Sequence, residues 1–158
     1  LAKLETKFDV QIITQNVDNL HERAGSSNVL HLHGELMKIR STGAGGEVFD
    51  IDPNNLEIHL NDKCPKGFQL RPHIVWFGEE VPTIEQAQKI VKQADIFIII
   101  GTSLQVYPAA GLVNYVKLNI PIYLIDPEKI SNTSKNMTII QKSASEGMRI
   151  LEEILLTL

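Results

Sequence analysis

The apolar run Ile96–Ile100 constrains the fold of this chain more than any other segment. It consists of four isoleucines and Phe97, which is the length of a strand rather than of a helix. Because no position in it is polar, both faces of the strand have to be covered. Strands of this kind occur in parallel sheets, whose connecting helices pack on the two faces. The run therefore predicts a parallel sheet with helices on both faces.

Strand-like and helix-like segments alternate along most of the chain. Residues 1–7 resemble the end of a helix. Short apolar runs then predict strands at 10–14, 29–33, 74–77, 96–100, 122–125 and 137–140. Apolar residues at helical spacing predict helices at 17–23, 83–94, 109–118 and 143–156. The alternation predicts the α/β class, with a Rossmann-like parallel sheet joined by right-handed crossovers.

Residues 34–70 have a different character. They contain the flexible stretch 41–46, the turn 52–55 and only scattered apolar side chains. We expect a small loop-rich insertion module there. The Rossmann-like domain would then be formed by residues 1–33 and 71–158.

Composition excludes several classes of protein. The net charge is -4 and no long basic run is present, so nucleic acid and anionic membranes are not expected partners. No apolar stretch approaches the roughly 20 residues that span a bilayer. The single cysteine excludes an internal disulfide and fits a reducing compartment. We expect a monomeric protein of the cytoplasm.

Polar side chains follow the first predicted strand. Gln15, Asn16 and Asp18 come directly after it, and the carboxyl ends of strands in an open α/β sheet are where ligands bind. Amide and carboxylate groups there can hydrogen-bond ribose hydroxyls and a carboxamide. The alternative is that Asn16 or Asp18 caps the short helix that follows, with Gln15 as a turn residue.

Two histidines lie near the end of the second predicted strand. His31 and His33 alternate with leucines, which places both imidazoles on one face of the strand. Histidine is the side chain best suited to accept and return a proton near neutral pH, so His33 is a candidate general base. The alternative is a strand histidine with a purely structural role, which is the role we expect for His31.

Two later segments also combine small and apolar residues. Gly101, Thr102 and Ser103 follow the isoleucine-rich strand, and a small-residue turn lets a ligand approach the main chain closely. A tight strand-to-helix loop, with Pro108 near the helix start, is the alternative. In the segment 70–79, the simplest interpretation is that Ile74, Val75 and Phe77 are core residues.

Four motifs, in chain order, resemble those of the sirtuins, the NAD-dependent protein lysine deacylases. They are TQNVDNLHERAG, LHLHGE, LRPHIVWFGE and GTSLQVYPAAGL. The resemblance implies an enzyme that transfers an acyl group from lysine to ADP-ribose and releases nicotinamide. It also implies NAD as the cofactor and acylated-lysine proteins or peptides as partners.

The resemblance assigns a role to each candidate residue. His33 would be the general base, and Asn16 and Asp18 would line the nicotinamide pocket. Asp126 stands where the family usually has asparagine. Cofactor-binding residues would be Gln15, Asn16, Asp18, Gly101, Thr102, Ser103, Asp126, Glu128 and Ala144. Acyl-peptide contacts would come from Val75, Phe77, Gly78, Glu79, Leu104 and Val106.

The resemblance covers only the C-terminal two thirds of a sirtuin catalytic domain. The family's first strand, its Gly-Ala-Gly phosphate loop and its arginine-bearing cofactor segment would precede Leu1. Residues 43–46 (Gly-Ala-Gly-Gly) lack the flanking strand and helix that a phosphate loop needs. Two alternatives therefore stay open. They are a catalytically incomplete fragment that binds NAD or acyl-peptide, and a mono-ADP-ribosyltransferase.

Many sirtuins hold a structural zinc ion in two CxxC pairs after the HG motif, and this chain departs from that pattern. Only Cys64 is present, and Ser41 stands roughly where the first pair would begin. A mixed site with His59 is the alternative. We predict no bound zinc, because a structural site needs four ligands. The module would instead be held by apolar contacts from Val48, Phe49, Ile51, Leu56, Ile58 and Leu60.

Overall fold

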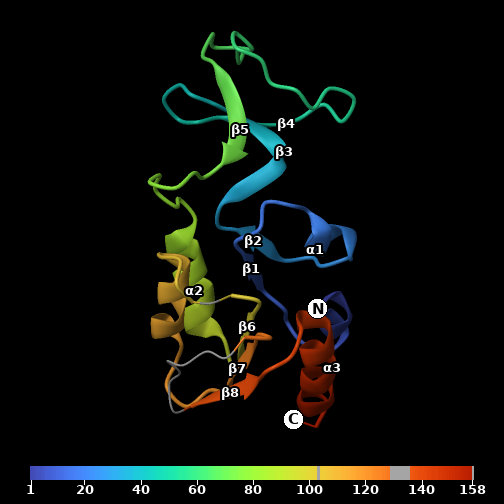
Figure 1. Ribbon diagram of the computed structural model, residues 1–158. Coiled ribbons are helices and arrows are strands. Elements are labelled where there is room, and N and C mark those ends of the chain that lie inside the picture. The colour runs from blue at the N-terminus through green and yellow to red at the C-terminus, as the bar shows by residue number, and fades with distance from the viewer. Residues whose placement is uncertain (103, 129–135, 158) are drawn as a thin grey trace. The chain divides into compact units, whose positions relative to one another are not determined.

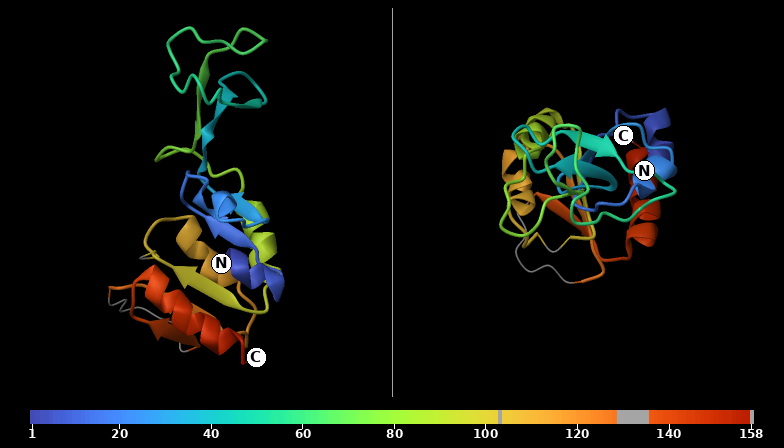
Figure 2. Two further views of the ribbon diagram at one scale, coloured as in Figure 1. Left: turned by 90° about the vertical axis from the view of Figure 1, so that its right-hand side faces the viewer. Right: turned by 90° about the horizontal axis from the view of Figure 1, so that it is seen from above.

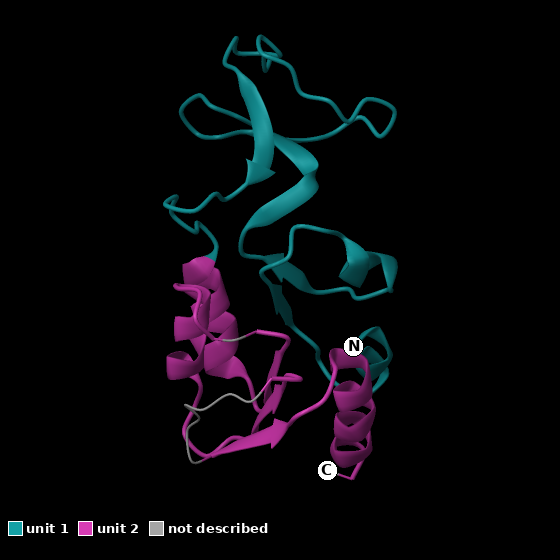
Figure 3. Ribbon diagram, in the orientation of Figure 1, with its two compact units in different colours: residues 1–83 teal, residues 84–158 magenta. Residues whose placement is uncertain are grey.

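The computed structural model describes residues 1–102, 104–128 and 136–157. The chain divides into two compact units, Leu1–Thr83 and Ile84–Leu158 (Figure 3). Each unit has its own sheets, and each is described by itself below. No helix in the described residues is long and apolar enough to cross a membrane.

The first unit begins with a 3-10 helix, η1 (Ala2–Thr6), and a short parallel strand pair. Strand β1 (Ile12–Thr14) lies beside β2 (Val29–His31), with Thr14 paired to His31. Both strands lie where they were predicted but are shorter. Helix α1 (Leu20–Arg23) lies between them in the chain and begins three residues later than expected.

The predicted loop-rich module contains more regular structure than expected. Strand β3 (Gly34–Ser41) pairs in antiparallel fashion with β4 (Val48–Asp50) and with β5 (Leu70–Ile74), in the order β4-β3-β5. The length of β3 and its pairing with β5 are visible in Figure 2. The predicted strand at 74–77 was wrong, because β5 ends at Ile74. Pro72 is tolerated within β5 because β5 is an edge strand.

The second unit is a three-stranded parallel sheet with helices on both sides. Strands β6 (Phe97–Ile100), β7 (Ile122–Ile125) and β8 (Met137–Ile140) lie in that order. Helix α2 (Ile84–Gln93) and the 3-10 helix η2 (Ala109–Tyr115) lie together on one side of this sheet, and α3 (Ala144–Leu155) lies on the other (Figure 1). The predicted strands were confirmed, whereas the segment expected as a helix at 109–118 is a shorter 3-10 helix.

The two faces of β7 form different contacts. Ile122 and Leu124 join Ile99 in a buried cluster on one face. Ile125, on the opposite face, is fully buried against α3. A Cβ added to Gly147 would lie 2.2 Å from the Cγ2 of Ile125, so a glycine is required for α3 to approach the sheet this closely. This packing fixes the carboxyl ends of β6 and β7, where several candidate site residues lie.

Candidate functional site

The ends of β1 and β2 bring the candidate base next to the first polar motif. The Nδ1 of His33 lies 3.0 Å from the carbonyl oxygen of Gln15. Because a carbonyl oxygen can only accept, Nδ1 carries a proton and donates it. In neutral His33 the unprotonated nitrogen is therefore Nε2, which is free to accept a proton. This arrangement is what general-base chemistry requires of an imidazole.

The neighbouring His31 is bonded at both ring nitrogens. Its Nδ1 lies 3.1 Å from the carbonyl oxygen of Asn16, and its Nε2 lies 2.8 Å from Oε1 of Glu22. Only the doubly protonated ring donates to both acceptors when Glu22 is ionised. The hydrogen bond from His31 lowers the pKa of Glu22. Glu22 was not predicted as a site residue, although a strand histidine such as His31, expected to be structural, needs a partner for its second ring nitrogen.

The polar motif itself has mixed roles. The main-chain N–H of Asn16 donates to Oγ1 of Thr14 at 3.1 Å, and the Asn16 side chain is exposed. Oδ1 of Asp18 accepts from the N–H of Leu20, the first residue of α1, at 3.0 Å. The N-cap of α1 is Asn19, without a side-chain capping bond, so Asp18 forms a turn before the helix rather than the cap of the alternative. Gln15 and Asn16 are thus fixed by their main chains, which leaves their side-chain amides available.

Val75 lies beside the candidate base. Its N–H donates to the carbonyl oxygen of His33 at 2.9 Å. The chain can make this contact because Gly34 has φ +84 and packs on the main chain of β5. A Cβ at Gly34 would lie 1.9 Å from the carbonyl oxygen of His73. Of the predicted peptide-contacting residues, Val75 is therefore adjacent to His33, whereas Phe77 is 100% exposed.

The side chain of Glu79 is committed to its own turn. Hydrogen bonds from Arg71 and from the N–H of Trp76 hold the pKa of Glu79 at about 2. Gly78 adopts φ +89 in the same turn. The N–H of Glu79 donates to the carbonyl of Trp76 at 3.0 Å. The predicted peptide contact of Glu79 would therefore involve its carbonyl oxygen, since its carboxylate is also bonded.

A second group of candidate residues lies at the carboxyl edge of the second unit's sheet. Strands β6, β7 and β8 end in register, and the N–H of Gly101 donates to Ile125 at 2.9 Å. Asp126 is buried, and its Oδ1 accepts from the N–H of Glu128 at 2.8 Å. This edge is where an open parallel sheet binds ligands. The Oγ1 of Thr102 accepts from Leu104 N–H at 3.3 Å.

The remaining candidates of this unit differ in exposure. Leu104 is partly buried against the cluster around Leu124, whereas Val106 is 44% exposed. Ala144 is exposed at the first turn of α3, directly after the capping residue Ser143. Ser103 lies outside the described residues.

In the loop-rich module, the residues at the expected zinc-site positions, Ser41 and Cys64, bond to each other. Sγ of Cys64 lies 3.3 Å from Oγ of Ser41, and both residues are buried. This hydrogen bond lowers the pKa of the Cys64 thiol. His59 lies next to Glu57, with 3.3 Å between Nε2 and Oε2. Within the described ranges, no three His, Cys, Asp or Glu side chains gather for a metal ion, so these residues do not fit a four-ligand zinc site.

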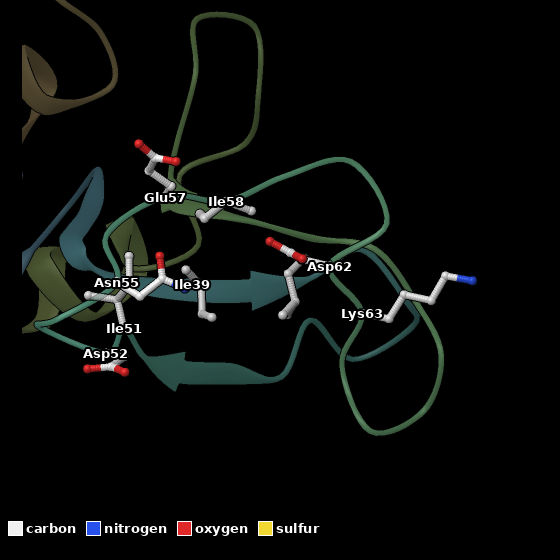
Figure 4. Close-up of a pocket in the computed structure, with 9 residues that line it drawn as sticks. Ile39, Ile51, Asp52, Asn55, Glu57, Ile58, Asp62 and Lys63 are labelled. Carbon is white, nitrogen blue, oxygen red and sulfur yellow. The ribbon is translucent and has the colours of Figure 1, made fainter.

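An open depression of about 320 Å³ lies elsewhere on the module (Figure 4). Its lining mixes apolar and acidic side chains, and Lys63 points away from the others. None of the candidate residues contributes to it. The lining consists of Ile39, Ile51, Asp52, Asn55, Glu57, Ile58, Asp62, Lys63 and Leu70.

One family of known proteins matches the part of the chain that contains His33. The Sir2 family model matches residues 1–108. This chain belongs to the Sir2 family. The match includes β1, β2, the histidine pair and the turn after β5, so it covers the first group of candidate residues completely.

Relatives of this Sir2 chain are found among bacterial proteins named NAD-dependent protein deacylase. The protein from Bacteroides thetaiotaomicron is 52% identical, over 99% of this chain and 68% of its own length. That from Aggregatibacter actinomycetemcomitans is 59% identical, over 80% of this chain and 60% of its own length. One from Helicobacter pylori is 49% identical, over 96% of this chain and 65% of its own length. The chain thus spans about two thirds of these relatives or slightly less.

Solved structures of Sir2 proteins share the fold. A Sir2 homologue in complex with NAD has a TM-score of 0.78 and 38% identity, over 98% of this chain and 63% of that chain. The Sir2 protein bound to a propionylated peptide has a TM-score of 0.76 and 30% identity, over 96% of this chain and 67% of that chain. The predicted Rossmann-like α/β fold is therefore confirmed.

Proposed function

We propose that the protein to which this chain belongs is an NAD-dependent protein lysine deacylase. The observation that carries the proposal is the orientation of His33. The Gln15 carbonyl fixes its Nδ1–H at 3.0 Å and leaves Nε2 as a proton acceptor. The names of the bacterial relatives support this function. The reaction would transfer the acyl group to ADP-ribose and release nicotinamide and free lysine.

The residues proposed to bind NAD form two groups. Gln15 would hydrogen-bond the nicotinamide ribose, and Asn16 and Asp18 would line the nicotinamide pocket. The carboxyl-edge residues of the second unit would contact the adenosine part, namely Gly101, Thr102, Ser103, Asp126, Glu128 and Ala144. His33 would accept a proton from a ribose hydroxyl at Nε2, which activates that hydroxyl as a nucleophile. The related structure with NAD supports this cofactor.

The substrate would be an acylated lysine in an extended peptide. Val75 is adjacent to His33 through a 2.9 Å main-chain hydrogen bond, so an acyl group beside it would lie near the base. Phe77, Leu104 and Val106 would add apolar contacts, which suit a lysine whose charge the acyl group has removed. Main-chain pairing with Gly78 and Glu79 would give affinity with little dependence on peptide sequence. The related structure with a propionylated peptide supports this class of substrate.

We further propose that the module is stable without zinc and that the protein acts as a monomer in the cytoplasm. The buried pair of Cys64 and Ser41, with 3.3 Å between Sγ and Oγ, supports a metal-free module. Elemental analysis after mild chelation tests whether the module is free of zinc. Stoichiometric zinc that survives chelation would contradict the proposal.

Product analysis tests the proposed reaction. The full-length protein is incubated with NAD labelled in the adenosine part and with an acetyl-lysine peptide. Mass spectrometry of the peptide and the location of the label are then recorded. A deacylase yields unmodified lysine and a labelled small molecule. A mono-ADP-ribosyltransferase would instead label protein, and a fragment that only binds would leave the peptide acetylated.

A further inference from the structure

The turn at residues 76–79 presents large aromatic side chains to solvent. Phe77 is 100% exposed and Trp76 is 56% exposed, so apolar burial does little to fix the turn. Gly78 adopts φ +89, and the N–H of Glu79 donates to the carbonyl of Trp76 at 3.0 Å. A segment with so few buried contacts is ordered only if polar interactions hold it.

The carboxylate of Glu79 supplies those interactions. Its Oε1 accepts from Nη1 of Arg71 at 2.6 Å. Its Oε2 accepts from Nη2 of Arg40 and from the N–H of Trp76, both at 3.1 Å. Nη2 of Arg71 also donates to the carbonyl of Ile74 at 3.2 Å. One carboxylate therefore joins both ends of the turn to β3 and to β5.

The carboxylate of Glu79 also stabilises the two arginines. Arg40 and Arg71 occupy directly opposite positions on β3 and β5, where like charges repel. Glu79 bonds to both guanidinium groups and offsets the repulsion. Its side chain is 33% exposed, and those of Arg40 and Arg71 are 21% and 26% exposed. The three charges therefore form one network that solvent screens only in part.

The turn leaves main-chain groups available. Across the residues that the structure describes, the N–H groups of Phe77 and Gly78 donate to no partner, whereas that of Glu79 does. Free main-chain groups at the end of an edge strand are what an extended peptide pairs with. Holding them in place before the peptide arrives removes an ordering cost from binding.

We propose that Arg71 and Arg40 are positioning residues that act through Glu79 to hold the turn ready for the main chain of an acylated peptide. This inference rests on the proposed deacylase function. It assigns the arginines to peptide affinity and gives them no part in proton transfer or in NAD binding.

Steady-state kinetics of the full-length protein test the inference when peptide and NAD are varied separately. Arg71→Gln is expected to raise the KM for peptide about tenfold, since the turn must then be ordered on binding. The kcat and the KM for NAD stay within about twofold of wild type. Arg71→Lys gives an intermediate KM. It keeps the charge but loses the bidentate contact, in which Nη1 donates to Oε1 at 2.6 Å and Nη2 to Oε2 at 3.3 Å. Lys66→Gln is the matched control. It breaks an exposed ion pair with Glu47 at 2.6 Å and changes none of these constants.

Trp76, the one tryptophan among these 158 residues, provides a readout that does not depend on turnover. Its quenching is compared between each variant and wild type, so that any tryptophan elsewhere in the full-length protein contributes equally to both. Arg71→Gln and Glu79→Gln are expected to increase the quenching of its emission by acrylamide. Lys66→Gln leaves quenching unchanged. Glu79→Gln alters an exposed turn, so it tests the network even where Arg71→Gln does not fold.

The outcomes separate this inference from the function on which it rests. Wild-type turnover, together with unchanged peptide KM and unchanged quenching in both variants, would overturn the inference alone. A lower kcat without a change in peptide KM would indicate a merely structural role and would also overturn it. A wild-type protein that leaves the peptide acetylated would overturn the proposed function and this inference with it.

Discussion

Replacing Gly34 by alanine is expected to destabilise the protein strongly. Gly34 has φ +84, and an L residue there costs about 1 kcal/mol or slightly more. The added methyl carbon would also lie 1.9 Å from the carbonyl oxygen of His73. That oxygen belongs to the main chain, so no side-chain rotation relieves the clash. Strand β3 has to move away from β5, which disrupts the bond from Val75 to His33 at about another 1 kcal/mol.

The conformational cost and the lost hydrogen bond sum to about 2 kcal/mol, and the displacement of β3 adds to them, so the loss in the free energy of unfolding is expected to exceed about 2 kcal/mol. Gly25→Ala is the matched control, because Gly25 has φ +94 but nothing within 4 Å of an added Cβ. It should lose only the conformational part, about 1 kcal/mol. Urea unfolding followed by circular dichroism measures both. A difference between the two variants of less than about 1 kcal/mol would refute the argument from close packing.

Two further predictions concern packing and pH. Leu151 is fully buried on α3, whereas Ile150 is 40% exposed. In urea unfolding, Leu151→Ala should lower the free energy of unfolding by about 3 kcal/mol and Ile150→Ala by about 1 kcal/mol or less. Equal losses in the two variants would contradict the packing of α3. The pKa of Glu79 is lowered to about 2 from the model-compound value of 4.5. Its contribution to stability is thus complete above about pH 5 and is lost as pH falls from there toward 2. Unfolding midpoints followed by Trp76 emission should show wild type losing its advantage over Glu79→Gln in that range, and a constant difference would contradict the assignment.

The sequence predicted best those elements whose burial is uniform. The strand Ile122–Ile125 is buried at every position, and its continuous apolar run predicted its bounds. In β7 the local pattern and the tertiary environment agree, so the pattern alone was sufficient. Met137–Ile140 was also predicted with the observed bounds, although Thr138 and Ile139 are exposed.

The sequence failed where a strand departs from regular pairing. Strand β3 was expected as part of a loop-rich module, because residues 34–70 contain a flexible stretch, a turn and only scattered apolar side chains. The structure explains this, since the register of β3 with β5 shifts between Gly34 and Ile39. The strand predicted at 74–77 was wrong because its apolar run continues past the end of the pairing. After Ile74 the N–H of Val75 makes one more bond, to the carbonyl of His33, and the chain then turns at residues 76–79.

The site was predicted only as far as residue identity allows. Gln15, Asn16 and His33 could be singled out, because polar groups at strand ends are a local signal. The pairing of His31 with Glu22 and of Glu79 with Arg71 could not, since both pairs depend on how separate segments meet. For Asp18 the pattern left two roles open; its carboxylate bonds to the N–H of Leu20, while the N-cap of α1 is Asn19.

Nicotinamide release by the full-length protein tests the central claim most directly. NAD and an acetyl-lysine peptide are supplied to wild type, to His33→Ala and to His59→Ala, a control at an exposed histidine of the module. His33→Ala is expected to lose at least about 100-fold in peptide-dependent turnover, while His59→Ala keeps wild-type turnover. Near wild-type turnover in His33→Ala would contradict the assignment of His33 as the base.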